Sequence, residues 1–218
     1  MTTDLVIIGS GGHGREMLDI VEAINHVAET FNVLGFLDDS DHNDALLARR
    51  GTTRLGPVEM LADIDAQYVI GIGSGAVRAC IDRRATELGR EAAVLVHPAA
   101  SMGGDVELAP GVVVAAGARI TTNVRLGRHT QLNVNCSVSH DCRLGDYVTV
   151  SPGATVSGTV TLEDGVLIGA GATVIQGLTV GRWTTVGAGA VVVRDLPADV
   201  VAVGVPARPR REIGRAHV

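Results

Sequence analysis

The segment SVSHDCRLGDYVTVSPG, residues 137 to 153, places a histidine and an aspartate next to each other among small and aliphatic residues. His140 follows the aliphatic Val138 by two positions, which puts it at a turn with its side chain pointing outward. An exposed imidazole exchanges a proton near neutral pH, and the carboxylate of Asp141 favours the imidazolium form. The pair predicts a general base. The alternative is a solvent-exposed histidine with no chemical role.

A glycine-rich stretch near the start of the chain could bind a phosphate group. The sequence GSGGHG carries Gly9, Gly11 and Gly14 between an apolar run and a helical pattern, where backbone N–H groups attract phosphate. Asp38 and Asp39 end the second apolar run, where a dinucleotide fold binds a ribose. We therefore expect this pair to serve ligand binding and not folding. NAD, another nucleotide and a purely structural turn all stay open for the glycine motif.

Two further groups of residues could join this site. Gly12 and His13 lie inside the same turn, and His13 would either face the phosphates or point into solvent. Gly73 and Ser74 form a second glycine-rich turn after the third apolar run, and Arg78 follows one helical turn later. The Arg78 guanidinium could pair with a phosphate, or Arg78 could be an ordinary arginine on a helix surface.

Composition and charge argue against several classes of function. The 218 residues have a net charge of −6 and scattered arginines, without the basic stripe that nucleic acids require. No apolar run approaches the roughly 20 residues that span a bilayer, and the N-terminus lacks the pattern of a signal peptide. We expect a cytoplasmic protein that binds neither nucleic acid nor membrane. Three cysteines without CxxC spacing predict small buried residues rather than disulfides or zinc ligands.

Residues 1 to 97 alternate short apolar runs with helical patterns. LVIIG predicts a strand, GREMLDIVEAINHV a helix, and NVLGFLDD and QYVIGIGSG two more strands. Pro57 suits the first turn of another helix, and AAVLVHP ends the series. Units of this length predict a parallel α/β sheet with right-handed crossovers. This Rossmann-like domain is about half the size of a full dinucleotide fold, with room for one mononucleotide.

The pattern changes from residue 98 onward. Every sixth residue from Met102 to Val192 is Met, Leu, Ile or Val, sixteen times in succession. This period fits short strands joined by turns, three of which close one coil of a parallel β-helix, so residues eighteen apart stack. A narrow interior excludes aromatic residues, which make up only 2% of the chain. No loop projects from the repeat, so an active site needs a second surface from the N-terminal domain or another copy of the chain.

Together these motifs resemble the left-handed β-helix acyltransferases, and within them the sialic-acid O-acetyltransferase and nucleotide-amino-sugar N-acetyltransferase family. The similar motifs are GSGGHG, FLDD, GIGSGAVR, SHDC and GVPAR, in this order over essentially the whole chain. The resemblance implies a Rossmann-like domain at 1–97, a left-handed β-helix at 98–218 and acetyl-CoA as donor. It also implies a homotrimer, whose interface we expect to exclude charge and to include VNCSVSH, residues 134–140.

The activity implied by the resemblance is N-acetylation of a nucleotide-linked amino sugar. O-acetylation of a sialic-acid-like or other sugar, and a catalytically silent nucleotide-sugar-binding scaffold, stay open as alternatives. Carbonic anhydrases share the β-helix but need three histidines at one subunit boundary. The six-residue repeat from Met102 to Val192 offers only His129 and His140, so no metal is expected.

The resemblance also implies roles for individual residues. His140 becomes the catalytic base, and the first glycine turn with Asp38 and Asp39 holds the nucleotide sugar. Asn133 resembles a position near the acceptor, although asparagines also form structural ladders in β-helices. Glycines at turns are equally required for the fold. The residues implied to contact acetyl-CoA are Gly158, whose N–H would face the thioester oxygen, and Gly169, Ala170, Gly187, Ala188, Val205 and Pro206.

Overall fold

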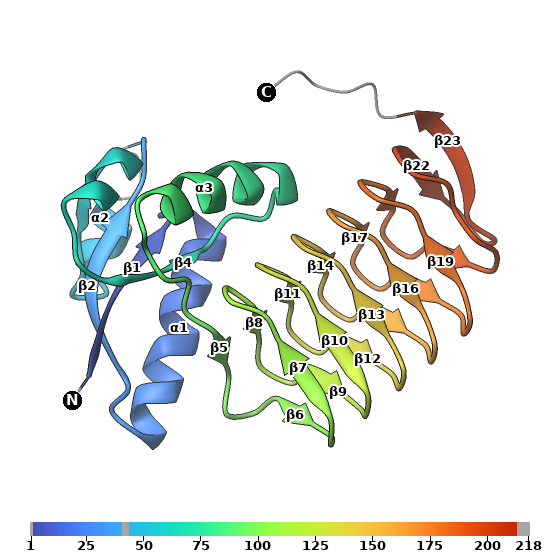
Figure 1. Cartoon of the computed structure of the whole chain (residues 1–218), viewed down its shortest axis with the longest axis horizontal. Helices are drawn as coiled ribbons and strands as arrows, with labels where there is room; N and C mark the ends of the chain where they lie inside the picture. Colours follow the sequence, from blue (N-terminus) through green and yellow to red (C-terminus); the bar gives the residue numbers. More distant parts are fainter. Residues whose placement is uncertain (1, 41–43, 213–218) are drawn as a thin grey trace. The chain divides into compact units, whose positions relative to one another are not determined.

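The computed structural model describes residues 2–40 and 44–212 (Figure 1). The chain divides between Pro98 and Ala99 into two compact units. The helices of the described residues all lie in the first unit, and the second consists of short strands joined by turns. None of these helices is long and apolar enough to cross a membrane.

A parallel sheet and the helices that connect its strands form the first unit. Its elements are β1 (Thr3–Ile8), α1 (Gly12–Val27), β2 (Phe31–Leu37), α2 (Asp44–Ala48), β3 (Arg54–Gly56), the 3₁₀ helix η1 (Val58–Ala62), β4 (Gln67–Ile70), α3 (Gly75–Glu87) and β5 (Leu95–Val96). The sheet has the order β3-β2-β1-β4, and each neighbouring pair runs parallel. Residues Leu5 to Ile8 of the central β1 are fully buried. The expected parallel α/β domain is confirmed.

Two details of this unit differ from the sequence prediction. The segment after Pro57 forms the five-residue η1 and not a longer α-helix. The sequence pattern gives no signal of β3, which pairs with β2 at the edge of the sheet and has only three residues, all half-buried. A strand this short shows no alternation of apolar and polar residues, so the hydrophobic pattern cannot detect it.

The second unit is a left-handed parallel β-helix with three walls, whose coils are stacked one after another in Figure 1. The first wall consists of β7 (Val106–Leu108), β10 (Val124–Leu126), β13 (Arg143–Leu144), β16 (Thr161–Leu162) and β19 (Thr179–Val180). The second wall contains β8 (Val113–Val114), β11 (Gln131–Leu132), β14 (Thr149–Val150), β17 (Leu167–Ile168), β20 (Thr185–Val186) and β22 (Val200–Val203), with β23 (Arg208–Glu212) antiparallel to β22. The third wall consists of β6 (Ser101–Met102), β9 (Arg119–Ile120), β12 (Ser137–Val138), β15 (Thr155–Val156), β18 (Thr173–Val174) and β21 (Val191–Val192).

The aliphatic residues of the six-residue repeat fill the interior of the β-helix. Ile120, Val138, Val156 and Val174 pair in register from coil to coil, and each is at most 3% exposed. The residue two positions before each of them is small and fully buried, because three converging walls leave little space. These small residues are Ala118, Cys136, Ala154 and Ala172.

Each corner of the β-helix repeats a left-handed backbone conformation every eighteen residues. Between the third and first walls, the residues in this conformation include Asp105, Asn123, Asp141 and Thr159, with φ of 55°, 57°, 61° and 59°. Glycine, asparagine and aspartate tolerate this conformation best. We call these four residues the corner column. Their side chains start from the same backbone geometry in successive coils.

The three cysteines are free thiols. Cys136 and Cys142 are buried in the β-helix as expected, and burial raises the pKa of Cys136 to about 12. Cys80 is exposed, which corrects the expectation for that residue. It lies between the buried positions Arg78 and Asp82 of α3, and a residue two positions away on a helix faces the opposite side.

Candidate active site

His140 lies at the corner between β12 and β13 with its ring on the outside. Its side chain is 58% exposed, whereas Val138 is 1% exposed, so the expected outward position is confirmed. Its Nδ1 atom lies 2.8 Å from Oδ2 of Asp141. Because a carboxylate only accepts hydrogen bonds, Nδ1 carries the proton in this pair. Nε2 is then left with a lone pair that can take up a proton.

The backbone of Asp141 allows this contact between neighbouring residues. Successive side chains along a strand point to opposite faces, but the φ of 61° at Asp141 breaks that alternation. Asn123, one coil earlier in the corner column, donates a hydrogen bond from Nδ2 to Oδ1 of Asp141 over 3.0 Å. The Asn123 amide, and after it His140, lowers the pKa of the Asp141 carboxyl below its ordinary value. Asp141 is therefore an ionised acceptor at neutral pH.

Sequence reasoning did not identify Asn123. The signal that could have found it is its position exactly one coil, eighteen residues, before Asp141 in the hexapeptide register. The residue type alone gives no such indication, because asparagine is common at left-handed corners for backbone reasons.

Gly158 occupies the same turn position as His140, one coil later, and lies against the imidazole. A Cβ atom at Gly158 would come within 2.5 Å of Nε2 of His140, so a side chain there would displace the ring. Within the described part of the chain, the backbone N–H of Gly158 donates no hydrogen bond. A free donor therefore lies beside the histidine.

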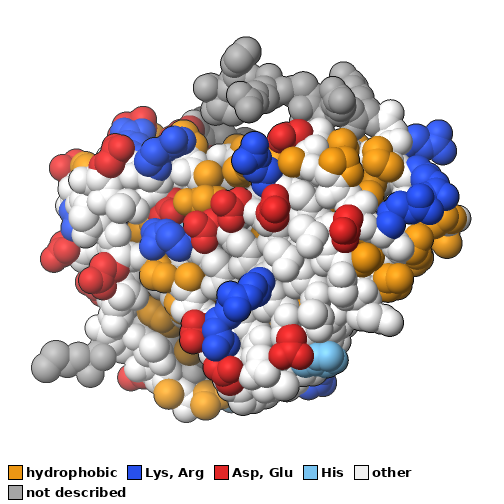
Figure 2. Space-filling view, turned by 45° about the vertical axis from the view of Figure 1, so that its right-hand side comes forward, with side chains coloured by type: hydrophobic (Ala, Val, Ile, Leu, Met, Phe, Trp, Pro, Cys, Tyr) orange, Lys and Arg blue, Asp and Glu red, His pale blue; other side chains and the backbone are white. Residues whose placement is uncertain are grey.

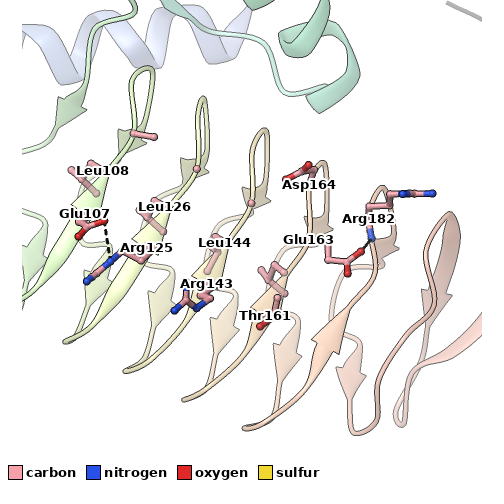
Figure 3. A pocket seen from close by; sticks show the side chains of 14 residues that line it. Glu107, Leu108, Arg125, Leu126, Arg143, Leu144, Thr161, Glu163, Asp164 and Arg182 are labelled. Atoms are coloured by element: carbon pink, nitrogen blue, oxygen red, sulfur yellow. Dashed lines mark hydrogen bonds and ion pairs between the residues drawn. The ribbon is translucent and has the colours of Figure 1, made fainter.

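A groove of about 840 Å³ runs along the first wall, whose strand β13 begins three residues after His140 (Figure 3). Arg125 points toward Glu107 in this view, and the Arg125 Nε to Glu107 Oε2 distance is 3.0 Å. Arg143, the first residue of β13, makes no ion pair within the described residues. Sequence reasoning missed this groove. The sequence feature that could have revealed the groove is an arginine at the outward position directly before the inward leucine in both β10 and β13.

In the first unit, the turn GSGGHG packs tightly on one side and is open on the other. A Cβ atom at Gly9, where φ is 98°, would lie 2.7 Å from Cγ1 of Ile72, and one at Gly14 would overlap the carbonyl of Gly9. No atom lies within 4 Å of a Cβ position at Gly11 or Gly12. Gly11 also gives α1 no side-chain cap. The open side therefore exposes backbone at the start of a helix, where an anion can bind.

The carboxylate of Asp38 has four internal hydrogen bonds. Its Oδ2 accepts from N and Oγ of Ser10 over 2.6 and 2.7 Å, and its Oδ1 accepts from N and Oγ of Ser40 over 3.0 and 2.7 Å. Partial burial alone would raise the pKa of Asp38, but these hydrogen bonds outweigh it and lower the pKa to about 2. Oδ1 of Asp39 accepts from the N–H of Val58 over 2.9 Å. Both residues thus have a structural role, which corrects the expectation that they do not serve folding.

His13 and the second glycine-rich turn are accessible. His13 lies in the first turn of α1, with Nδ1 2.8 Å from Oε2 of Glu16. Gly73 and Ser74 are exposed, and no atom lies within 4 Å of a Cβ position at Gly73. The Ser74 hydroxyl caps α3 by accepting from the N–H of Val77 over 3.4 Å.

Arg78 differs from both alternatives that the sequence left open. Its side chain is 0% exposed, and Nη1 donates to the carbonyls of Ile72 and Gly73 over 3.0 and 2.9 Å. Burial lowers the pKa of the guanidinium to about 10. Arg78 is neither a phosphate ligand nor a surface residue. It holds the loop after β4 against the start of α3, and its buried neighbours Asp82 and Ala85 mark the inner face of that helix.

Gly169 and Gly187, two of the three glycines implied to contact acetyl-CoA, lie at the corner between the second and third walls. A Cβ atom at Gly169 would lie 2.6 Å from N of Ala188, and one at Gly187 would lie 2.7 Å from Cγ1 of Val203. Close stacking of successive coils alone therefore requires both glycines. Ala170 and Ala188 follow them and are exposed, so a ligand can reach this corner.

The three other predicted residues, Val205, Pro206 and Asn133, have different surroundings. Val205 and Pro206 lie between β22 and β23, where Val205 is 73% exposed. Asn133 donates from Nδ2 to the carbonyl of Val150 in the next coil over 3.1 Å, but the residues one coil before and after it are Ala115 and Ser151, so it is not part of an asparagine ladder.

The structure brings the predicted residues together in two groups, one in each unit. Gly9, Ser10 and Asp38 meet at the end of β1, and His140, Asp141 and Gly158 meet at one corner of the β-helix. Residues 2–40 and 44–212 contain no group of three or more metal-ligating side chains. On the face shown in Figure 2, basic and acidic side chains are interspersed.

The chain is similar to solved structures over nearly its whole length. Perosamine N-acetyltransferase from Caulobacter crescentus, solved with CoA and GDP-perosamine, shares 32% sequence identity with it, over 96% of this chain and 97% of that one, with a TM-score of 0.84. The chain belongs to the hexapeptide-repeat family of nucleotide-amino-sugar N-acetyltransferases.

Two further solved structures are similar to this chain over nearly its whole length. The acetyltransferase domain of PglB from Neisseria gonorrhoeae, solved with acetyl coenzyme A, is 31% identical over 96% of this chain and 100% of that one, with a TM-score of 0.87. WeeI from Acinetobacter baumannii is 28% identical over 96% and 100%, with a TM-score of 0.83. The PglD N-terminal domain family matches residues 4–85. Among curated proteins, no sequence matches this chain.

Proposed function

We propose that this protein transfers the acetyl group of acetyl-CoA to the amine of a nucleotide-linked amino sugar. The observation that carries the proposal is the exposed His140, whose Nδ1 is bound by an ionised Asp141 and whose Nε2 lies against Gly158. The similar Caulobacter enzyme is a perosamine N-acetyltransferase, and two of its structures carry Asn or Ala in place of one histidine.

In the proposed reaction, Nε2 of His140 removes a proton from the amine as the amine nitrogen attacks the thioester carbonyl carbon. The new C–N bond forms, the C–S bond breaks, and coenzyme A leaves as the thiolate. The N–H of Gly158 donates to the carbonyl oxygen as negative charge develops on it. Asp141 keeps Nδ1 protonated and stabilises the imidazolium that forms. No covalent enzyme intermediate is required.

The first unit would hold the nucleotide of the acceptor. The open backbone at Gly11 and Gly12 suits a phosphate, and the accessible Gly73 and Ser74 provide a second surface. Asp38 supports this turn from behind through Ser10. Asp39, His13 and Asn133 are proposed to contact the acceptor. The exposed corner at Ala170 and Ala188, followed by Val205 and Pro206, is proposed to contact the donor.

We further propose a homotrimer in the cytoplasm. On the third wall, the outward residues Ser137, Thr155, Thr173 and Val191 form a half-buried, uncharged surface next to the His140 corner, and the exposed Arg119 of β9 lies one coil before Ser137 in the same column. A second copy packed there would supply the surface that the loop-free β-helix lacks. Free cysteines agree with a reducing compartment.

A thiol-release assay with matched acceptors tests the proposed function. Purified protein and acetyl-CoA are mixed with nucleotide-linked amino sugars, with the same nucleotides carrying a hydroxyl in place of the amine, and with free sialic acid. We expect coenzyme A release only with an amino sugar, and a product heavier by one acetyl group. Release with a hydroxyl acceptor alone would support O-acetylation, and binding without release would support a silent scaffold.

A further inference from the structure

Asn123 lies one coil before Asp141 and has no assigned role in the reaction. Its Nδ2 donates to Oδ1 of Asp141 over 3.0 Å, while Oδ2 of the same carboxylate lies 2.8 Å from Nδ1 of His140. Each oxygen of Asp141 thus has one side-chain partner. We propose that Asn123 is a positioning residue, which fixes the Asp141 carboxylate so that Nδ1 of His140 stays protonated and Nε2 stays available as a base. This inference rests on the proposed function.

The backbone of the corner column sets the geometry of this contact. Asn123 and Asp141 have φ of 57° and 61°, so their side chains leave the corner in the same direction from successive coils. The coils are tied together here by the N–H of Asp141, which donates to the carbonyl of Thr122 over 3.1 Å. The last torsion of an aspartate side chain has only a broad preference. The Asn123 amide therefore restricts a carboxylate that the chain itself would leave free to rotate.

The neutral charge of Asn123 also matters, because this column contains carboxylates on both sides of it. Asp105, one coil earlier, is held by Arg125 with an Oδ1 to Nη2 distance of 2.8 Å. A carboxylate at position 123 would face Asp141 at hydrogen-bond distance, where two negative charges oppose each other's ionisation. Asparagine supplies a donor at this point without adding charge.

A purely structural role is the alternative, since asparagine is favoured in the left-handed conformation. Asn135, at the corner between the second and third walls, has the same φ of 57°. Among the described residues, its side chain makes no hydrogen bond, and its Oδ1 lies over Gly117. Asn135 has the same residue type and backbone but no carboxylate partner, and it serves as the matched control once ultracentrifugation shows that Asn135→Gly keeps the oligomeric state of the wild type, because residues 134–140 are expected at the subunit interface.

The first experiment compares Asn123→Gly with Asn135→Gly, since glycine keeps the left-handed backbone in both. We expect similar changes in melting temperature for the two variants. Only Asn123→Gly should lower kcat, by about tenfold, the usual effect of losing one hydrogen bond to a charged group. The KM for acetyl-CoA should stay within about twofold of the wild type, because the groups proposed to bind the donor are unchanged.

Two further measurements separate positioning from folding. Nitrogen-15 NMR of the His140 ring reports which nitrogen carries the proton, and Asn123→Gly should increase the fraction protonated at Nε2. Asn123→Asp keeps the side-chain shape and adds a negative charge. That charge stabilises the imidazolium, so the acid limb of the pH–rate profile should move to higher pH by about one unit. If Asn123→Gly does not fold, the pH–rate profile of Asn123→Asp still tests whether Asn123 positions Asp141.

Equal kcat and an equal ring tautomer in Asn123→Gly and Asn135→Gly would overturn the proposal. An unshifted pH–rate profile in Asn123→Asp would do the same. If the wild type acetylates no amino sugar, the proposed function fails, but the NMR tautomer of His140 in the variants still tests whether Asn123 positions the pair.

Discussion

His140 is exposed and lies over a glycine, so its substitution should affect chemistry and leave the fold intact. In His140→Asn, no side-chain atom can take up the proton of the amine. We expect turnover to fall by about 10²- to 10⁴-fold, the usual contribution of a general base. The melting temperature and acetyl-CoA affinity should stay near those of the wild type, as measured by thermal unfolding and calorimetry. If this variant keeps more than about half of the wild-type rate, His140 is not the general base, and His13 becomes the next candidate.

Asp38 should stabilise the fold in a pH-dependent way. Its pKa is about 2 in the folded protein against an ordinary 3.8, so its stabilising contribution is present above about pH 4 and is lost as pH falls toward 2. After allowance for screening by solvent, we expect Asp38→Asn to cost about 1 to 2 kcal/mol at pH 7. Urea unfolding at pH 7, 4 and 3 measures the free energy of unfolding of both proteins. The difference between Asp38→Asn and the wild type should become smaller as the pH falls. Asp63→Asn, an exposed control, should show no such trend.

At the residue scale, the sequence predicted which residues could carry the chemistry of the site. It did not predict the hydrogen bonds that hold these and neighbouring residues in place. The outward position of His140 follows from the hexapeptide register, and the structure confirms it. The partners of Asp38 could not be predicted, because Ser10 lies 28 residues away and meets Asp38 only when β1 pairs with β2. The burial of Arg78 was missed because arginine is rarely fully buried, and the sequence does not show that its Nη1 donates to the carbonyls of Ile72 and Gly73.

At the scale of elements, Arg78 links α3 to the loop that follows β4. Replacing it by methionine leaves the carbonyls of Ile72 and Gly73 without these donors at a partly buried position. We expect a loss of about 2 to 4 kcal/mol in the free energy of unfolding. Affinity for the nucleotide should also weaken, because Gly73 is no longer held.

The control for this prediction is Arg84→Met on the same helix, whose exposed pair with Glu59 should contribute less than about 1 kcal/mol. Denaturant unfolding and nucleotide titration of both variants provide the comparison. Equal stability of Arg78→Met and Arg84→Met would contradict the structural role of Arg78.

The two units differ in how completely their elements could be predicted. The coils of the β-helix were anticipated from Met102 to Val192, because one inward aliphatic residue recurs at every sixth position, whereas β22 and the antiparallel β23 lie beyond this repeat and were not. The α/β unit was anticipated in its sheet and main helices but not in β3 or η1, since elements of three to five residues carry too few positions for a period to show. The groove on the first wall was missed because its charges alternate with inward leucines.

For the whole molecule, we predict a trimer that packs through the third wall. Thr155→Arg would place a charge between Ser137 and Thr173, in the uncharged part of this wall, and should dissociate the assembly, with loss of activity. Thr179→Arg on the first wall is the control, because that position is exposed and lies on a wall that already carries charges. Analytical ultracentrifugation gives the mass. A fully active monomer at nanomolar concentration would rule the trimer out.

The unbroken eighteen-residue spacing of the corners also limits how this chain can change its length during evolution. One extra residue within a coil would turn every later inward valine outward and would move each left-handed position onto a residue unsuited to it. A whole coil, by contrast, can be gained or lost without changing which residues face inward. The protein should therefore lengthen or shorten in units of one coil, and such events should be tolerated far from Asn123 and Gly158 but not between them.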